Sequence, residues 1–278
     1  MEQRAVFVDV DGTLVDHRGT VPESAKEAIR AARGNGHLVF LCTGRSVPQI
    51  WPEVREIGFD GFVAAAGGYV EVDGQVLRHE AVPVEQVRRL VEFFDARGVE
   101  YLLESNDGLF GSPRVASTMA ELMLGSVTDE DVLAALERGL ASFLDSIVLE
   151  WDVASIHVNK CSFLGSDLPL AEVQAALGDA FDVIPSTVPM FGRSSGELSM
   201  RGVHKAAGIE VAISHLGISR ERTIAFGDGF NDLEMLEFAG VGVAMGNAQP
   251  AVKQRADLVT GAVDADGLLE GFRATGLI

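Results

Sequence analysis

The sequence predicts an α/β protein in which a doubly wound parallel sheet forms the core and a smaller α/β domain is inserted into it. Short, continuous apolar runs alternate with helical stretches in the first third of the chain, and the same alternation returns in the last third. Strand, helix and strand at this spacing indicate parallel crossovers with helices on both faces of the sheet. A long stretch with a different pattern separates the two thirds.

The elements of the core follow from local signals. Residues 5–10 form a β-branched apolar run, which is typical of a strand buried on both faces. Residues 22–33 are predicted to be a helix, because Pro22 suits its first turn and Gly34 is a stop signal. Further strands are expected at 37–42, 61–66, 222–226, 241–245 and 257–260, and helices at 203–216 and 232–238.

The middle of the chain, residues 83–187, is predicted to be the inserted domain, with residues 1–82 and 188–278 forming the core. Prolines mark both junctions, at Val82-Pro83 and Ile184-Pro185, as is common where one domain interrupts another. Within the insert we expect helices at 84–96 and 129–142, and strands at 99–104, 147–150 and 155–163.

Composition excludes several classes of function. The formal net charge of −19 disfavours nucleic acid and anionic membranes as partners. Cys42 and Cys161 form no zinc-binding cluster. No apolar run approaches the ~18 residues that span a bilayer, and the N-terminal residues lack the features of a signal peptide. We therefore expect a soluble, cytoplasmic protein, whose oligomeric state the sequence does not indicate.

Polar residues gather where predicted strands end or a helix begins. The carboxyl edge of a parallel sheet is where such folds build their sites. The four segments are Asp9-Val10-Asp11-Gly12-Thr13, Thr43-Gly44-Arg45, His204-Lys205 and Asp228-Gly229-Phe230-Asn231-Asp232.

These residue types together point to phosphoryl transfer. Carboxylates that converge at one edge repel one another unless a cation lies among them, and oxygen donors without Cys or His favour Mg²⁺. The strand-to-helix turn at Thr43 and Gly44 offers backbone N–H groups to an anion. Lys205 supplies the local positive charge that an acidic protein needs to hold a phosphate.

Each segment also has a simpler interpretation when taken alone. Asp-x-Asp-Gly-Thr after a strand is often only a turn. A calcium loop of the EF-hand type is excluded, because it needs Gly at its sixth and Glu at its twelfth position, where counting from Asp9 gives Leu14 and Thr20. Gly240-x-Gly242 lacks the third glycine of a dinucleotide-binding loop. The prediction of phosphoryl transfer therefore rests on the occurrence of all four segments in this order.

That order resembles the four motifs of the haloacid dehalogenase (HAD) superfamily. The later runs Val243-Ala244-Met245-Gly246-Asn247-Ala248 and Ala256-Asp257-Leu258-Val259-Thr260, together with the position of the insert, resemble the Cof-type phosphatase subgroup. The likeness covers both core segments closely and the insert only by its size and place. It implies a HAD-like core with an inserted cap domain.

The resemblance also implies roles. Asp9 would be the nucleophile that forms an aspartyl-phosphate. Asp11 would protonate the leaving group and then deprotonate water, and it distinguishes phosphatases from dehalogenases, which lack an Asp there. Mg²⁺ would be held by the carboxylates of Asp9 and Asp228 and by the main-chain carbonyl of Asp11.

The remaining roles concern the phosphoryl group and the leaving group. Asp232 would orient Lys205 or a metal-bound water. The phosphoryl group would be contacted by Thr43, Gly44, Lys205 and Asn231, and the substrate or cap by Arg45 and Gly68. One departure is Ala66, where Cof-type proteins often carry Asn.

The resemblance implies a small phosphorylated metabolite as substrate, with sugar phosphates first and flavin mononucleotide or pyridoxal phosphate after them. Two alternatives stay open. A phosphomannomutase-like phosphotransferase would depend on a bisphosphate activator. A regulatory protein that binds a phospho-ligand without turning it over would not need Asp11.

Overall fold

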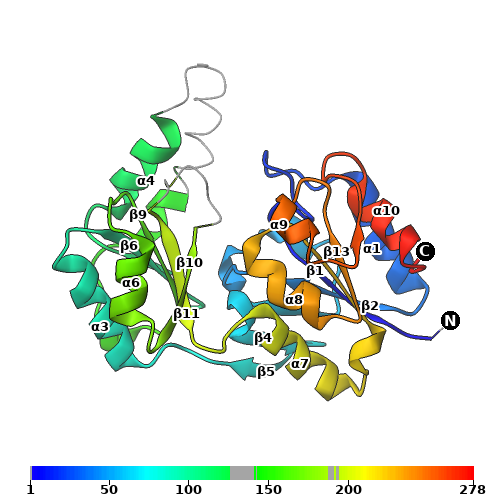
Figure 1. Ribbon diagram of the computed structural model, residues 1–278. Coiled ribbons are helices and arrows are strands. Elements are labelled where there is room, and N and C mark those ends of the chain that lie inside the picture. The colour runs from blue at the N-terminus through cyan, green and yellow to red at the C-terminus, as the bar shows by residue number, and fades with distance from the viewer. Residues whose placement is uncertain (1, 126–140, 142, 187–190, 192–193) are drawn as a thin grey trace. The chain divides into compact units, whose positions relative to one another are not determined.

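The computed structural model describes residues 2–125, 141, 143–186, 191 and 194–278, which fall into two compact units. The first unit, called the core, consists of Met1–Glu80 and Val203–Ile278, and the second, called the inserted unit, is Ala81–Gly202. Each unit is built on its own sheet (Figure 1). The predicted α/β fold with an insert is therefore confirmed.

The core sheet has eight strands within the described residues, in the order β14-β13-β12-β1-β2-β3-β4-β5. Strands β14 to β3 are parallel, whereas β4 and β5 are antiparallel to their neighbours. Their bounds are β1 Ala5–Val8, β2 Leu38–Cys42, β3 Gly61–Ala64, β4 Tyr69–Val72, β5 Gln75–His79, β12 Thr223–Gly227, β13 Val241–Ala244 and β14 Leu258–Val259.

Both faces of the core sheet are covered by helices, which explains why its strands are apolar without alternation. In β1, Val6 and Val8 pack toward one face, and Ala5 and Phe7 toward the other. Helices α1 Glu23–Gly34 and α10 Gly267–Ala274 cover the first face, and the second is covered by α7 Lys205–Leu216, α8 Leu233–Phe238 and α9 Pro250–Lys253. The short α2, Pro52–Arg55, follows β2.

Helix α1 illustrates how local sequence sets these elements. Its buried residues, Ala25, Ala28, Ile29 and Ala32, recur at intervals of three and four and form one stripe. Glu23 in the first turn and Arg33 in the last turn complement the helix dipole. Pro22 precedes the helix, one position earlier than the predicted first turn.

The inserted unit has a six-stranded sheet within its described residues, in the order β10-β11-β9-β6-β7-β8. Only the pair β7 and β8 is parallel. Helices α3 Val84–Asp95 and α6 Leu170–Leu177 pack on one face, and α4 Val115–Leu124 packs on the other. The strands are β6 Glu100–Ser105, β7 Leu109–Gly111, β8 Ile147–Val148, β9 Val158–Leu164, β10 Phe181–Pro185 and β11 Gly196–Met200.

The observed division of the chain differs from the predicted one at its second junction. The insert was expected to end at residue 187, but the inserted unit extends to Gly202 because β11 pairs with both β9 and β10. Pro185 is the last residue of β10, an edge strand that tolerates proline. It therefore does not mark a linker. The helix expected at 129–142 lies, apart from residue 141, outside the described residues.

Among the helices in the part of the chain that the structure describes, none is long and apolar enough to cross a bilayer.

Candidate active site

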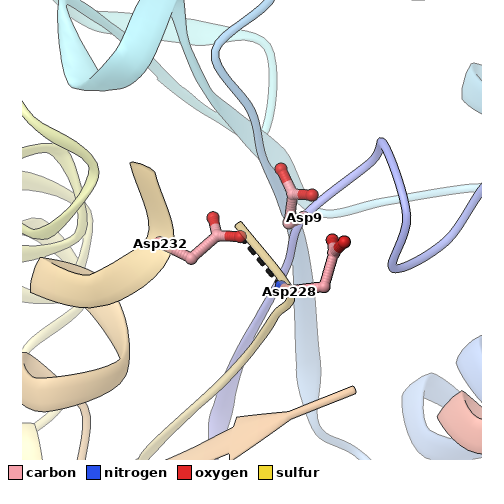
Figure 2. Close-up of side chains that lie close together, drawn as sticks. All are labelled: Asp9, Asp228 and Asp232. Atoms are coloured by element: carbon pink, nitrogen blue, oxygen red, sulfur yellow. Dashed lines mark hydrogen bonds between the residues drawn. The ribbon is translucent and has the colours of Figure 1, made fainter. Parts of the chain in front are cut away.

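An aspartate directly follows each of two neighbouring strands of the core. Strands β1 and β12 are parallel and in register from Ala5–Thr223 to Val8–Phe226, so the chain leaves both at the same edge. Asp9 follows β1 and its N–H donates to the Phe226 carbonyl at 3.0 Å, whereas Asp228 follows β12. With Asp232 they form a cluster in which one carboxylate oxygen of each residue lies within 4.8 Å of the others (Figure 2).

A tight turn brings the two strand ends together. Gly12 has φ of 86°, a left-handed conformation that favours glycine. A side-chain Cβ at Gly12 would lie 2.3 Å from Asp228 Oδ2, so only glycine fits there. Thr13 Oγ1 donates to Asp228 Oδ1 at 3.0 Å. Asn247 Nδ2 donates to Asp228 Oδ2 at 3.2 Å and to the Gly12 carbonyl at 2.8 Å, so Asp228 is held from both sides.

Lys205 is the first residue of α7 and is buried within this cluster. Its Nζ donates to Asp9 Oδ1 at 2.6 Å and to Asp232 Oδ1 at 2.5 Å. The other oxygen of Asp232 accepts from the backbone N–H groups of Asp228 and Gly229, at 3.0 and 2.9 Å. Figure 2 shows the bond to Asp228. Asp232 therefore contacts both the lysine and the backbone of the loop that carries Asp228.

The electrostatics of the cluster favour a bound cation. Burial, followed by the charge of Asp232, raises the pKa of Asp9 well above its usual range. The same two causes raise the pKa of Asp228 to about 6. Burial alone would lower the pKa of Lys205, but the charges of Asp232 and Asp9 outweigh it and the net shift is upward. Three carboxylates face one ammonium group, and a divalent ion would balance them.

The donor set fits a hard metal ion. The three residues of the cluster are all aspartates, and no Cys or His belongs to it among the residues described. Carboxylate oxygens are the ligands that Mg²⁺ and Ca²⁺ prefer. The cluster can therefore hold a divalent cation.

The residues that follow β2 lie at the same edge of the sheet. Thr43 is buried, and its Oγ1 accepts from the Arg45 N–H at 3.1 Å. The Arg45 side chain forms two bonds to Asp11, from Nε to Oδ2 at 2.8 Å and from Nη2 to Oδ1 at 2.7 Å. The Asp11 carboxylate is therefore paired with Arg45 and is not a member of the acidic cluster.

The comparisons with known proteins identify the family. A family model described as haloacid dehalogenase-like hydrolase matches residues 6–272. The chain is a haloacid dehalogenase-like hydrolase. It is 30% identical to the Bacillus subtilis protein YkrA over 279 residues, which cover the full length of both chains.

Two further relatives are phosphatases by name. The pyridoxal phosphate phosphatase YbhA of Escherichia coli is 27% identical, and the alignment covers 97% of each chain. The solved structure of the subclass IIB sugar phosphatase BT4131 is similar with a TM-score of 0.79 and 27% identity, covering 99% of this chain and all of that one. This haloacid dehalogenase-like hydrolase is thus of the phosphatase type, which confirms the resemblance found in the sequence.

The turn after β3 corrects one sequence prediction for the hydrolase. A strand was expected to continue to residue 66, but it ends at Ala64, and Ala65, Ala66 and Gly67 all have positive φ. The Ala66 N–H donates to the Thr43 carbonyl at 3.1 Å. The Gly68 N–H donates to the Ala65 carbonyl at 3.0 Å, which gives Gly68 a role in closing this turn.

Gly67 explains why the turn is so tight. A Cβ on Gly67 would lie 2.2 Å from the carbonyl oxygen of His204, the residue that caps α7. The turn therefore packs directly against the start of the helix that carries Lys205. Positive φ at Ala66 is a conformation that Asn adopts more readily than Ala, which gives a backbone reason for the Asn that Cof-type proteins often carry there.

The structure thus brings Asp9, Asp228 and Asp232 into one cluster, in which Lys205 binds Asp9 and Asp232. It places Thr43 at the same sheet edge and Asn231, half-buried, beside Gly229. Sequence reasoning missed the functional contacts of Thr13 and Asn247. Both belong to motifs quoted for the family likeness, and Thr13 directly follows the Asp-x-Asp-Gly turn.

Proposed function

We propose that this phosphatase hydrolyses phosphomonoesters of small metabolites, sugar phosphates first, by transferring the phosphoryl group to Asp9 and then to water. The observation that carries the proposal is the position of Asp9. It is buried at the strand end, is held by Lys205 at 2.6 Å and shares a cluster with two further carboxylates. The names of YbhA and BT4131 support pyridoxal phosphate and sugar phosphates as the substrates to test first.

Mg²⁺ is the proposed cofactor. The carboxylates of Asp9 and Asp228 and the main-chain carbonyl of Asp11 would hold the ion, and the all-oxygen donor set of the cluster fits it. When bound, the ion offsets the negative charge that a phosphate and several carboxylates bring together.

In the first step an Asp9 carboxylate oxygen attacks phosphorus, and the bond between phosphorus and the ester oxygen breaks. Asp11 donates a proton to the leaving alkoxide. In the second step Asp11 takes a proton from water, the water oxygen attacks phosphorus, and the bond from Asp9 to phosphorus breaks. The products are the free alcohol and inorganic phosphate.

The other residues bind and orient. Lys205 keeps the Asp9 carboxylate in one orientation and would contact a phosphoryl oxygen as charge builds up there. Thr43, Gly44 and Asn231 would contact the remaining phosphoryl oxygens. Asp232, with its oxygens shared between Lys205 and two backbone N–H groups, holds this arrangement before substrate binds.

The test is phosphate release from a panel of phosphorylated metabolites, with and without Mg²⁺, for the wild type and for Asp9→Asn. We expect turnover that needs Mg²⁺, and a loss of at least about a thousandfold in Asp9→Asn, since Asn has nearly the same volume but is no nucleophile. Thermal unfolding should show that the variant is folded. Comparable turnover by Asp9→Asn would contradict the proposal.

A further inference from the structure

Arg45 contacts both the Asp11 carboxylate and the ring of Trp51. Its guanidinium lies over the Trp51 ring, 4.4 Å from the centroid, while Nε and Nη2 bind the two oxygens of Asp11. Nη1 donates to the main-chain carbonyl of Gln49 at 2.9 Å. The guanidinium is therefore held on its face by Trp51 and along its edges by Asp11 and Gln49.

The backbone of Arg45 is fixed as well. Its N–H donates to Thr43 Oγ1 at 3.1 Å, and its carbonyl accepts from the Ala65 N–H at 2.8 Å. These bonds tie it to the end of β2 and to the turn after β3. The Arg45 side chain is 23% exposed, whereas that of Asp11 is 56% exposed. The arginine is thus the better-anchored member of the pair.

We propose that Arg45 is a positioning residue for Asp11, and that Trp51 and the Gln49 carbonyl hold Arg45 in place for that purpose. The inference rests on the proposed function, in which Asp11 passes a proton to the leaving group and takes one from water. Proton transfer requires the carboxylate at a defined place. Two parallel bonds from a fixed guanidinium set both the direction and the plane of the Asp11 carboxylate.

The competing role for Arg45 is a direct contact with the substrate. The observed bonding favours positioning, because Nε and Nη2 are directed at Asp11 and Nη1 at the Gln49 carbonyl. Because the pair is bidentate and the Arg45 side chain is largely covered, the free energy of unfolding of each variant is measured beside its activity.

A double-mutant cycle distinguishes the two roles. The activities compared are those of the wild type, Arg45→Lys, Asp11→Asn and the double variant, each measured with glucose 6-phosphate or the best sugar phosphate of the panel. Lysine keeps the charge but cannot form the paired bonds. We expect Arg45→Lys to lower kcat about 10- to 100-fold with KM changed less than about threefold. In the Asp11→Asn background the same substitution should change kcat less than about twofold.

A second substrate provides a readout that a purely structural role would not change. The leaving group of p-nitrophenyl phosphate departs without a proton, so its release in the first turnover does not need Asp11 as an acid. Arg45→Lys should lower that first-turnover rate less than about threefold.

Trp51→Leu should show the same pattern as Arg45→Lys, with kcat for the sugar phosphate lowered about three- to tenfold. Trp51→Phe, which keeps a ring face, is the matched control.

An Arg45→Lys effect that is equally large in the Asp11→Asn background, or that falls on KM, would overturn the proposal and assign Arg45 to the substrate. Equal loss with both substrates would also contradict it. A wild type that releases no phosphate, or an Asp9→Asn variant that still does, would instead contradict the proposed function. Thermal unfolding of each variant shows whether a loss reflects unfolded protein.

Discussion

A buried lysine lies between two carboxylates in each unit of the chain. In the core this is Lys205, and in the inserted unit it is Lys160, whose Nζ lies 2.8 Å from Glu197 and 3.4 Å from Glu104. Burial and neighbouring charge act on both lysines alike. In each, burial would lower the pKa, and the two carboxylates reverse the shift. By residue type and charge the two sites are nearly the same.

They differ in where the backbone places them. Lys160 lies within β9, directly opposite Glu104 of β6 and Ser199 of β11, so its contacts are cross-strand pairs on a sheet face. Lys205 instead begins a helix and contacts Asp9, which follows β1, and Asp232, which lies in the turn between β12 and α8. There a further carboxylate, Asp228, joins the cluster, so that three carboxylates accompany one lysine, against two carboxylates at Lys160. The two clusters therefore differ in backbone position and in the number of carboxylates, and these differences are the basis for proposing the core cluster as the active site.

Replacing each lysine in turn should separate activity from stability most strongly. Lys205→Met should lower phosphate release about a thousandfold, because the charge beside the phosphoryl group is lost. Lys160→Met should instead lower the free energy of unfolding by about 3 kcal/mol, because two buried carboxylates lose their partner. Its kcat per folded molecule should stay within about tenfold of the wild type. Urea unfolding and phosphate release measure the two effects separately.

The distinction between Lys205 and Lys160 would be contradicted if both substitutions gave the same loss of activity in fully folded protein. In that case the cluster of the inserted unit would also take part in the reaction. Glu104→Gln, which keeps the shape of the side chain, provides a milder check on the inserted unit, and it should change stability more than kcat.

The next prediction concerns Asp228, the third carboxylate of the core cluster. Asp228→Asn should raise the Mg²⁺ concentration for half-maximal activity at least about tenfold and lower the maximal rate about a hundredfold, since a charged ligand becomes neutral. Thr13→Val removes only the bond to Asp228 Oδ1 and should give a smaller rise in the same Mg²⁺ titration. An unchanged Mg²⁺ response in Asp228→Asn would remove that residue from the ligand set.

Much of the core could be predicted because its signals are local. The continuous apolar run before Asp9 and the stop signals after Arg33 depend on neighbours in sequence. The contacts that sequence reasoning missed depend on distant segments. Asn247 reaches Gly12 across 235 positions of the chain, and the bond from Arg45 to Asp11 spans 34. The periodicity of apolar residues along the chain does not indicate such pairs.

The inserted unit was predicted less well for a related reason. Its end was placed after Pro185, because proline commonly marks a linker. What decides the boundary is the pairing of β11 with β9 and β10, which joins residues far apart in sequence. The alternating polar pattern of such strands, with Glu197 and Ser199 on one face, gives a weak local signal.

The two units also differ in backbone strain, for which a small change in stability is expected. Among the described residues, the non-glycine residues with positive φ are Ala65, Ala66, Asp73 and Asp266, all in the core. Ala66→Gly should raise the free energy of unfolding by about 0.5–1 kcal/mol, because relief of the strain exceeds the added entropy of the unfolded chain. The matched control is Ala64→Gly at φ of −110°, which should lower it. Chemical denaturation measures both free energies of unfolding. If both substitutions changed that free energy in the same direction, the strain at Ala66 would be contradicted.

Trapping the phosphoryl group on the protein shows directly whether Asp9 is the nucleophile. The enzyme is mixed with Mg²⁺ and its best substrate, quenched in acid within the first turnover, digested, and the peptides are sequenced by mass spectrometry. We predict a phosphoryl group on the peptide that contains Asp9, located at that residue, and none in Asp9→Asn. Turnover with the phosphoryl group on another residue, or with no covalent phosphate at any time during turnover, would contradict the assignment of Asp9 as the nucleophile.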